Sequence, residues 1–246
     1  MKRIVRAFFM SLGMFTALPC PYRPWDEEAR PLALVCLPTV GAVIGALWAL
    51  LAALGHRLLP GVSAALLAAL PWLLTGFIHL DGYMDACDAL LCWRPLEQRL
   101  RVLKDPRAGA FAVVGLGLLM LFSYDAARHI DLAQIGAVRT LVLIPVVSRC
   151  GSAFSVLTLK PLGHSEYAQM DGAPAQRLAV AFMWALSVIA CAVWPGACAV
   201  ALLAETAVYA AAMAWACHTM KGVSGDLAGF ALTLSECAAL VVLANR

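Results

Sequence analysis

The chain has 246 residues, of which 63% are apolar and 13% are charged, and its mean hydropathy is +0.83. About a quarter of the residues of a soluble domain are charged, so this composition excludes a soluble protein. It is typical of a chain that crosses a membrane several times. The net charge is only +3, and we expect a lipid bilayer, and no nucleic acid, among the partners.

The N-terminal segment opens with Lys2, Arg3 and Arg6 and then becomes apolar, as a signal peptide does. Prolines on both sides of Cys20 argue against cleavage there. We interpret residues 4–18 as an amphipathic or re-entrant segment, and its basic residues as the mark of an end that faces the cytoplasm.

The remainder is a series of long apolar runs separated by short polar segments. A helix that spans a bilayer needs about 17–25 apolar residues. Runs of this kind cover residues 32–54, 62–79, 108–124, 138–158, 177–194 and 197–217, and a last one follows residue 226. We predict an all-α fold, a polytopic transmembrane helical bundle of about seven spans (six to eight), that forms a single domain over residues 1–246. Gly41 and Gly45 have the spacing of small residues at a close helix contact.

Basic residues are distributed unevenly between the two ends of these spans. With the N-terminus inside, four lie outside (Arg57, Arg128, Arg139, Arg246) and Arg149 lies within a span. The other 13 of the 18 lie inside: Lys2, Arg3, Arg6, Arg23, Arg30, Arg94, Arg99, Arg101, Lys104, Arg107, Lys160, Arg177 and Lys221. This bias predicts a cytoplasmic location for three polar segments, 81–107, 159–176 and 218–226. Their convergence on one face of the bundle favours an active site there.

The segment 81–107 carries the most unusual chemistry, because it begins with three aspartates, Asp81, Asp85 and Asp88. If residues 81–90 are helical, these carboxylates fall within an arc of about 60° on one face. Carboxylates so close repel one another unless a cation lies between them. Magnesium suits such a site, since it takes one or two carboxylates and completes its shell with water and substrate phosphates. The simpler alternative is a solvated helix end whose acids and bases pair among themselves.

A basic tract follows the aspartates, and it is what a phosphate or diphosphate needs around it. Its members are Arg94, Arg99, Arg101, Lys104 and Arg107, with Asp105 among them. Arg149 lies inside an apolar run, where a guanidinium is costly unless it faces a cavity or a partner. Its two interpretations are a phosphate clamp and an ion pair with an acid on a neighbouring helix. His79 is either a ligand or acid–base group, or simply a hydrogen-bonded residue at a helix end.

These motifs together resemble the cobalamin synthase family, also called adenosylcobinamide-GDP ribazoletransferase. The resemblance is carried by Leu18-Pro19-x-Pro21, His79-Leu80-Asp81-Gly82 with Asp85 and Asp88, Arg99, Lys104-Asp105-x-Arg107-x-Gly109, Arg149, and Gly222-x-Ser224-Gly225-Asp226-x-x-Gly229 with Glu236. Departures from the family pattern occur at Ala17, Ala89, Pro106 and Thr233, and the last puts any role of that position in doubt.

The resemblance implies a transferase of cobalamin biosynthesis in the inner membrane of a prokaryote. It would join α-ribazole or its 5′-phosphate to adenosylcobinamide-GDP with release of GMP and formation of adenosylcobalamin or its 5′-phosphate. Magnesium is the implied cofactor. A corrinoid nucleotide and α-ribazole are the implied partners. Other cobalamin-assembly enzymes and a second copy of the chain are further candidates.

The resemblance also implies roles for individual residues. Asp81 and Asp85 would hold Mg²⁺, and Asp88 would be a third ligand or a general base. Lys104 and Arg107 would grip the diphosphate, with Asp105 orienting them or completing a second metal site. The substrate-binding residues would be His79, Arg99, Arg149, Ser224, Asp226 and Glu236.

Two other classes of protein stay open as alternatives. An intramembrane CDP-alcohol phosphotransferase also uses spaced aspartates, but its motif runs Asp-x-x-Asp-Gly, whereas here Gly82 follows the first aspartate. A cation-coupled transporter places its acids near the middle of the bilayer in repeated, broken helices. Here the acids lie at a span boundary beside basic residues, and the chain has no visible repeat.

Overall fold

The computed structural model describes residues 2–20, 26–55, 58–162 and 173–246, which are almost entirely helical. The helices in chain order are α1 (Lys2–Phe15), α2 (Arg30–Leu54), α3 (Pro60–Leu74), α4 (Ile78–Leu91), α5 (Leu96–Val102), α6 (Ala110–His129), α7 (Ile135–Thr158), α8 (Pro174–Val193), α9 (Ala199–Met220) and α10 (Gly225–Ala244). Within these ranges, β-type backbone pairing is limited to one isolated bridge, between Pro161 and Val223.

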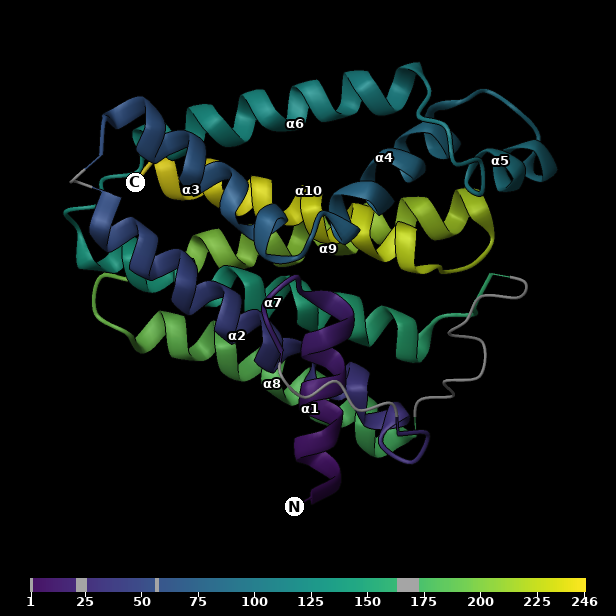
Figure 1. The fold of residues 1–246 in the computed structure, drawn as a ribbon, viewed down its shortest axis with the longest axis horizontal. Coiled ribbons are helices and arrows are strands. Elements are labelled where there is room, and N and C mark those ends of the chain that lie inside the picture. The colour runs from purple at the N-terminus through teal and green to yellow at the C-terminus, as the bar shows by residue number, and fades with distance from the viewer. Residues whose placement is uncertain (1, 21–25, 56–57, 163–172) are drawn as a thin grey trace.

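Six of these helices are long and apolar enough to cross a membrane: α2, α6, α7, α8, α9 and α10. The pair α3 and α4 passes the same test only when its two helices are taken together. The prediction of an all-α multi-pass bundle of about seven spans is therefore confirmed. The long helices run roughly side by side along the longest dimension of the molecule (Figure 1).

The second predicted span, residues 62–79, differs from the expectation of a continuous helix. Helix α3 ends at Leu74, and α4 starts at Ile78 with its axis turned by 91°. Gly76 (φ 59°) and Phe77 (φ 65°) both adopt the left-handed conformation between them. That conformation breaks the helical hydrogen-bond pattern and is costly for a residue with a Cβ, so Phe77 depends on the surrounding structure to hold it. The bend moves the aspartates out of the line of α3.

Helix α7 lies in the interior of the bundle, and α2 packs against it at very short range. A Cβ at Gly41 would lie 2.2 Å from the carbonyl oxygen of Pro145, and one at Gly45 would lie 2.1 Å from that of Val142. The two glycines therefore form the predicted close contact. In contrast, α8 exposes large apolar side chains along its length, as a helix does that faces lipid: Leu178, Phe182, Leu186, Ile189 and Val193.

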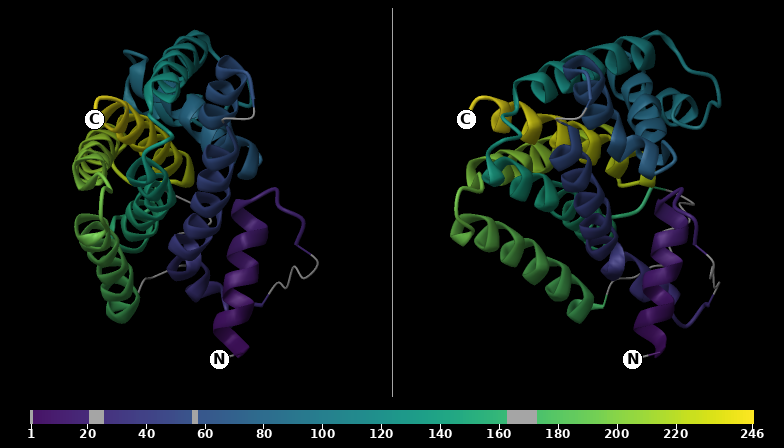
Figure 2. Two further views of the ribbon diagram at one scale, coloured as in Figure 1. Left: turned by 90° about the vertical axis from the view of Figure 1, so that its left-hand side faces the viewer. Right: turned by 60° about the vertical axis from the view of Figure 1, so that its left-hand side comes forward.

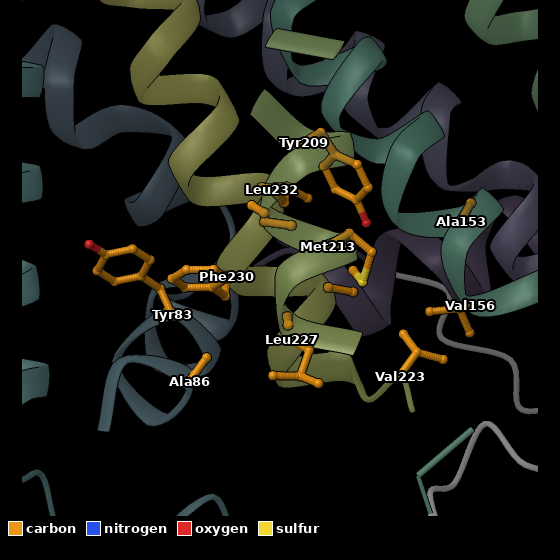
Figure 3. Packing of buried hydrophobic residues seen from close by; sticks show 14 of the residues in the cluster. Tyr83, Ala86, Ala153, Val156, Tyr209, Met213, Val223, Leu227, Phe230 and Leu232 are labelled. Atoms are coloured by element: carbon orange, nitrogen blue, oxygen red, sulfur yellow. The ribbon is translucent and has the colours of Figure 1, made fainter. Parts of the chain in front are cut away.

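Helix α4 is held in place by aromatic packing against α10 (Figure 3). The rings of Tyr83 and Phe230 stack with centroids 5.5 Å apart. The hydroxyl of Tyr83 also donates a hydrogen bond of 3.1 Å to the carbonyl oxygen of Gly115 on α6. Thr233, one of the departures noted in the sequence analysis, donates a hydrogen bond of 3.3 Å to the carbonyl oxygen of His79. These contacts fix the helix that carries the aspartates.

Helix α1 lies across the long helices, beside α2 (Figures 1 and 2). One face is buried, through Ala7, Met10, Ser11 and Phe15, while Ile4 and Val5 are exposed. Arg6 pairs with Asp26 at 2.9 Å and so ties α1 to the segment before α2. The prediction of an amphipathic segment near residues 4–18 is confirmed for this helix.

Candidate active site

The aspartates are helical, as the sequence analysis required for them to share a face. Helix α4 carries all three, and the predicted polar segment 81–107 contains most of this helix and all of α5. Their environments differ: Asp81 is exposed, Asp85 is half-buried and Asp88 is buried. The charges of Asp81 and Asp88 act on Asp85, so the three carboxylates form one electrostatic group.

The structure gives Asp88 a contact that the sequence analysis did not anticipate. Its Oδ2 accepts a hydrogen bond of 2.6 Å from the backbone N–H of Gly109, and its Oδ1 accepts one of 3.0 Å from that of Ala112. Both donors belong to the start of α6, where unpaired N–H groups favour a negative charge. Gly109 is required there because a Cβ would lie 2.6 Å from Oδ1 of Asp88. Asp88 therefore anchors α6 to α4.

A fourth carboxylate, Asp226, lies beside the acidic face of α4. Helix α10 starts at Gly225, and the N-cap Ser224 accepts a hydrogen bond of 3.3 Å from the N–H of Leu227. A Cβ at Gly82 would lie 2.8 Å from the Cα of Asp226, so α4 and α10 touch at this point. The charge of Asp226 also acts on Asp85, and that of Asp81 acts on Asp226. Two segments far apart in the sequence thus meet as predicted.

The predicted polar segment 159–176 joins this end of the bundle through its backbone. The N–H of Leu162 donates a hydrogen bond of 2.8 Å to the carbonyl oxygen of Val223, and the N–H of Val223 donates one of 2.9 Å to that of Lys160. Residues 163–172, most of the predicted segment 159–176, lie outside the described residues, as do Pro21, Arg23 and Arg57. The described parts of all three polar segments meet at one end of the bundle.

A cavity of about 760 Å³ opens where these segments meet. Of the predicted site residues, His79, Lys104, Ser224 and Asp226 line it. Arg101 also lines it. The sequence analysis included this residue in the basic tract but did not select it as a site residue. Its separation from Lys104 by three residues, which puts two helical side chains on one face, was the signal available.

Two of the predicted basic residues contact the protein itself. Arg99 donates hydrogen bonds from Nη1 to the carbonyl oxygens of Ala89 (3.2 Å) and Leu90 (2.6 Å), which closes the C-terminal end of α4. Arg107 pairs with Asp105 at 2.8 Å on the surface. The hydrogen bonds from Arg107 lower the pKa of Asp105 to about 2, so that this pair stays charged at any physiological pH.

Arg149 and Glu236 lie deeper, in the interior of the bundle. The Nη1 of Arg149 donates to Oε1 of Glu236 at 2.7 Å, and the Ser148 hydroxyl donates to the same oxygen at 2.8 Å. Arg149 is 1% exposed and Glu236 is 5% exposed. Of the two interpretations of Arg149, the ion pair with an acid on a neighbouring helix is the one seen. Sequence reasoning missed Glu205, which is fully buried and interacts with both charges.

His79 lies at the start of α4 with its ring buried against Phe15 of α1. The ring centroids are 6.2 Å apart and the planes differ by 13°. The ring nitrogen Nε2 has no hydrogen-bond partner among the described residues. A buried polar atom of this kind usually has a hydrogen-bond partner, so Nε2 is suited to form a hydrogen bond with a bound ligand.

These features define a class of protein: a multi-pass helical membrane protein whose bundle carries, at one end, a cavity lined by Asp226 and by basic side chains. Comparison with known proteins narrows that class. Residues 7–244 match the family model described as cobalamin-5-phosphate synthase, and the chain belongs to this family.

Several curated relatives are similar along nearly their whole length. Adenosylcobinamide-GDP ribazoletransferase from Clostridium perfringens (strain 13) is 32% identical over 99% of both chains. The proteins of the same name from Clostridium botulinum (strain Alaska E43) and Stutzerimonas stutzeri are 32% and 34% identical, each over 96% of both chains. No solved structure matches the chain.

Proposed function

We propose that this protein is an adenosylcobinamide-GDP ribazoletransferase. It joins α-ribazole or its 5′-phosphate to adenosylcobinamide-GDP, with release of GMP, in cobalamin synthesis. The observation that carries the proposal is the match to relatives of that name over nearly the whole chain. The site agrees, because a cavity lined by Arg101 and Lys104 together with Asp226 suits a diphosphate substrate.

The CDP-alcohol phosphotransferase and the cation-coupled transporter are not favoured, because the family match covers residues 7–244. A transporter would also be expected to place its acids near the middle of the bilayer. Asp81, Asp85 and Asp226 lie at one end of the bundle, beside the cavity.

The carboxylates fit Mg²⁺ in the way that this ion usually binds. No group of three or more His, Cys, Asp or Glu in the described residues forms a metal site by itself. Magnesium needs only one or two protein carboxylates when substrate phosphates complete its shell. One or two of Asp81, Asp85 and Asp226 would hold it, since both oxygens of Asp88 already accept backbone hydrogen bonds. When bound, it would neutralise charge on the diphosphate.

The remaining residues bind and position the substrates. Lys104 and Arg101 line the same cavity as Asp226 and attract the diphosphate, whereas Arg107 lies on the surface and is paired with Asp105. Asp88 and Arg99 fix the C-terminal part of α4 to α6 and α5, respectively. Phosphoryl transfer depends mainly on such positioning and charge stabilisation.

We further propose that the protein lies in the inner membrane of a prokaryote and that its site faces the cytoplasm. Most of the basic residues belong to the end of the bundle that carries the cavity, and the positive-inside rule assigns that end to the cytoplasm. Water-soluble nucleotide substrates would then reach the site directly from the compartment that contains them.

The direct test supplies membranes that contain the protein with adenosylcobinamide-GDP, α-ribazole and Mg²⁺, and follows GMP release and a new corrinoid. We expect product, and its loss with EDTA and with Asp85→Asn. Asp125→Asn is the matched control, because Asp125 is an exposed carboxylate at the other end of α6. Folded protein without product under all conditions would contradict the proposal.

A further inference from the structure

The cavity has two chemically different walls. The charged side chains that line it, Arg101, Lys104 and Asp226, come from α5, the residues just after it, and the start of α10. The wall formed by α1, α2 and α7 is apolar except for Ser152. Its apolar members, all buried, are Phe15, Leu34, Leu37 and Val156. A ligand that matches both walls has a charged or hydroxylated end and a flat or compact apolar end.

The volume of the cavity selects between the two proposed substrates. About 760 Å³ falls within the range of about 300–1,000 Å³ that holds a drug-sized ligand. A nucleoside has this size. A corrinoid that carries a nucleoside diphosphate has several times as many atoms, so only a part of it could enter.

The apolar wall also selects between the two bases in the reaction. Guanine has donors and acceptors along its edge, and these would be costly to bury against leucine and valine side chains. The base of α-ribazole, a dimethylbenzimidazole, is flat and apolar and has one unsubstituted ring nitrogen, which can only accept a hydrogen bond. The nearly parallel rings of Phe15 and His79 provide an aromatic surface of matching shape.

We propose that this cavity is the binding site of the acceptor nucleoside. Its base lies against the α1–α2–α7 wall and its ribose points toward Asp226, and Nε2 of His79 donates a hydrogen bond to the free ring nitrogen. The corrinoid nucleotide then approaches from outside the cavity, with its diphosphate near Arg101 and Lys104. This inference rests on the proposed function, whose two substrates it assigns to separate places.

The first experiment fills the cavity without touching a charged group. Val156→Phe adds a ring to the apolar wall, and Val113→Phe makes the same change on the exposed face of α6, outside the cavity. We expect Val156→Phe to weaken equilibrium binding of α-ribazole alone, and to raise its KM, by tenfold or more. The KM for adenosylcobinamide-GDP stays within twofold of the wild-type value, and Val113→Phe changes neither constant.

The second experiment tests the hydrogen bond from His79. The analogue is the riboside of dimethylindole, in which a C–H replaces the free ring nitrogen. We expect the wild type to bind α-ribazole at least tenfold more tightly than this analogue. His79→Leu should bind the two ribosides equally, because it has no donor for the nitrogen. A wild type that does not distinguish the two ribosides would overturn the assignment of His79.

The outcomes separate this inference from the proposed function. Binding of α-ribazole that Val156→Phe weakens, without turnover by the wild type, supports the subsite and contradicts the proposed function. Normal turnover in which Val156→Phe affects only the corrinoid substrate, or neither substrate, overturns the subsite and leaves the function intact. If Val156→Phe does not fold, Leu162→Trp repeats the test at a half-buried lining position.

Discussion

At the scale of single residues, Asp226 connects the acidic face of α4 to the cavity. Its Cα lies close to Gly82, and its charge acts on Asp85. If Asp226 is a metal ligand, Asp226→Asn should raise the Mg²⁺ concentration for half-maximal turnover by about 10–100-fold. Titration of Mg²⁺ in the GMP-release assay measures this, with Asp125→Asn as the control. An unchanged Mg²⁺ requirement with a higher KM for α-ribazole would instead place Asp226 on the ribose.

Asp88 leads to the opposite expectation, because its oxygens are both used by the backbone of α6. Asp88→Ala should lower the free energy of unfolding by about 0.5–2 kcal/mol, the usual cost of losing a helix cap. The measurement is thermal unfolding of the purified protein in detergent, compared with Asp125→Ala, which removes an exposed carboxylate from α6. Unchanged stability together with a raised Mg²⁺ requirement would identify Asp88 as a metal ligand.

The contrast between these two aspartates shows what sequence reasoning could and could not reach. Helical spacing predicted that Asp81, Asp85 and Asp88 share one face if residues 81–90 are helical, and the structure places all three on α4. It could not show that Asp88 accepts hydrogen bonds from Gly109 and Ala112, because those donors come from the start of another helix. The buried position of Glu205 was likewise hidden, since an acid within an apolar run does not reveal its neighbours.

At the scale of helices, α2 and α7 pack against each other at very short range in the interior. Gly41→Ala should destabilise the protein by about 1–3 kcal/mol, because the added methyl group would overlap the carbonyl oxygen of Pro145. Gly117→Ala on α6 is the control, since a Cβ there meets no atom within 4 Å. Thermal unfolding in detergent compares the two variants, and equal melting temperatures would contradict this packing.

The pattern Gly41-x-x-x-Gly45 predicted this contact from the sequence, but the sequence analysis did not anticipate the bend between α3 and α4. Residues 62–79 are mostly apolar, and they were interpreted as one helical span although Pro71, Thr75 and Gly76 interrupt the run. The break results from two consecutive left-handed residues, Gly76 and Phe77, and Phe77 is not a residue type that usually adopts this conformation. Tertiary packing therefore decides the path of the chain here, and with it the direction of α4.

At the scale of the whole molecule, the bend raises the question of how many times the chain crosses the membrane. The start of α3 lies with the end of α2 at one end of the bundle, whereas α5 and the start of α6 lie at the other (Figure 1). Helices α3 and α4 thus carry the chain from one end to the other, although they do so around a corner of 91°. Counted as one span, they bring the total to seven.

Seven spans place the two termini on opposite sides of the membrane, whereas six would place them on the same side. With the basic end inside, a reporter fused after Arg246 should lie outside the cytoplasm. Alkaline phosphatase fused there should be active and green fluorescent protein dark. Fusions that follow Lys160, near the cavity, should give the reverse result, because α7 ends on the cytoplasmic side. A fluorescent C-terminal fusion would mean that α3 and α4 form a re-entrant loop, and the positive-inside assignment of the later helices would then have to be inverted.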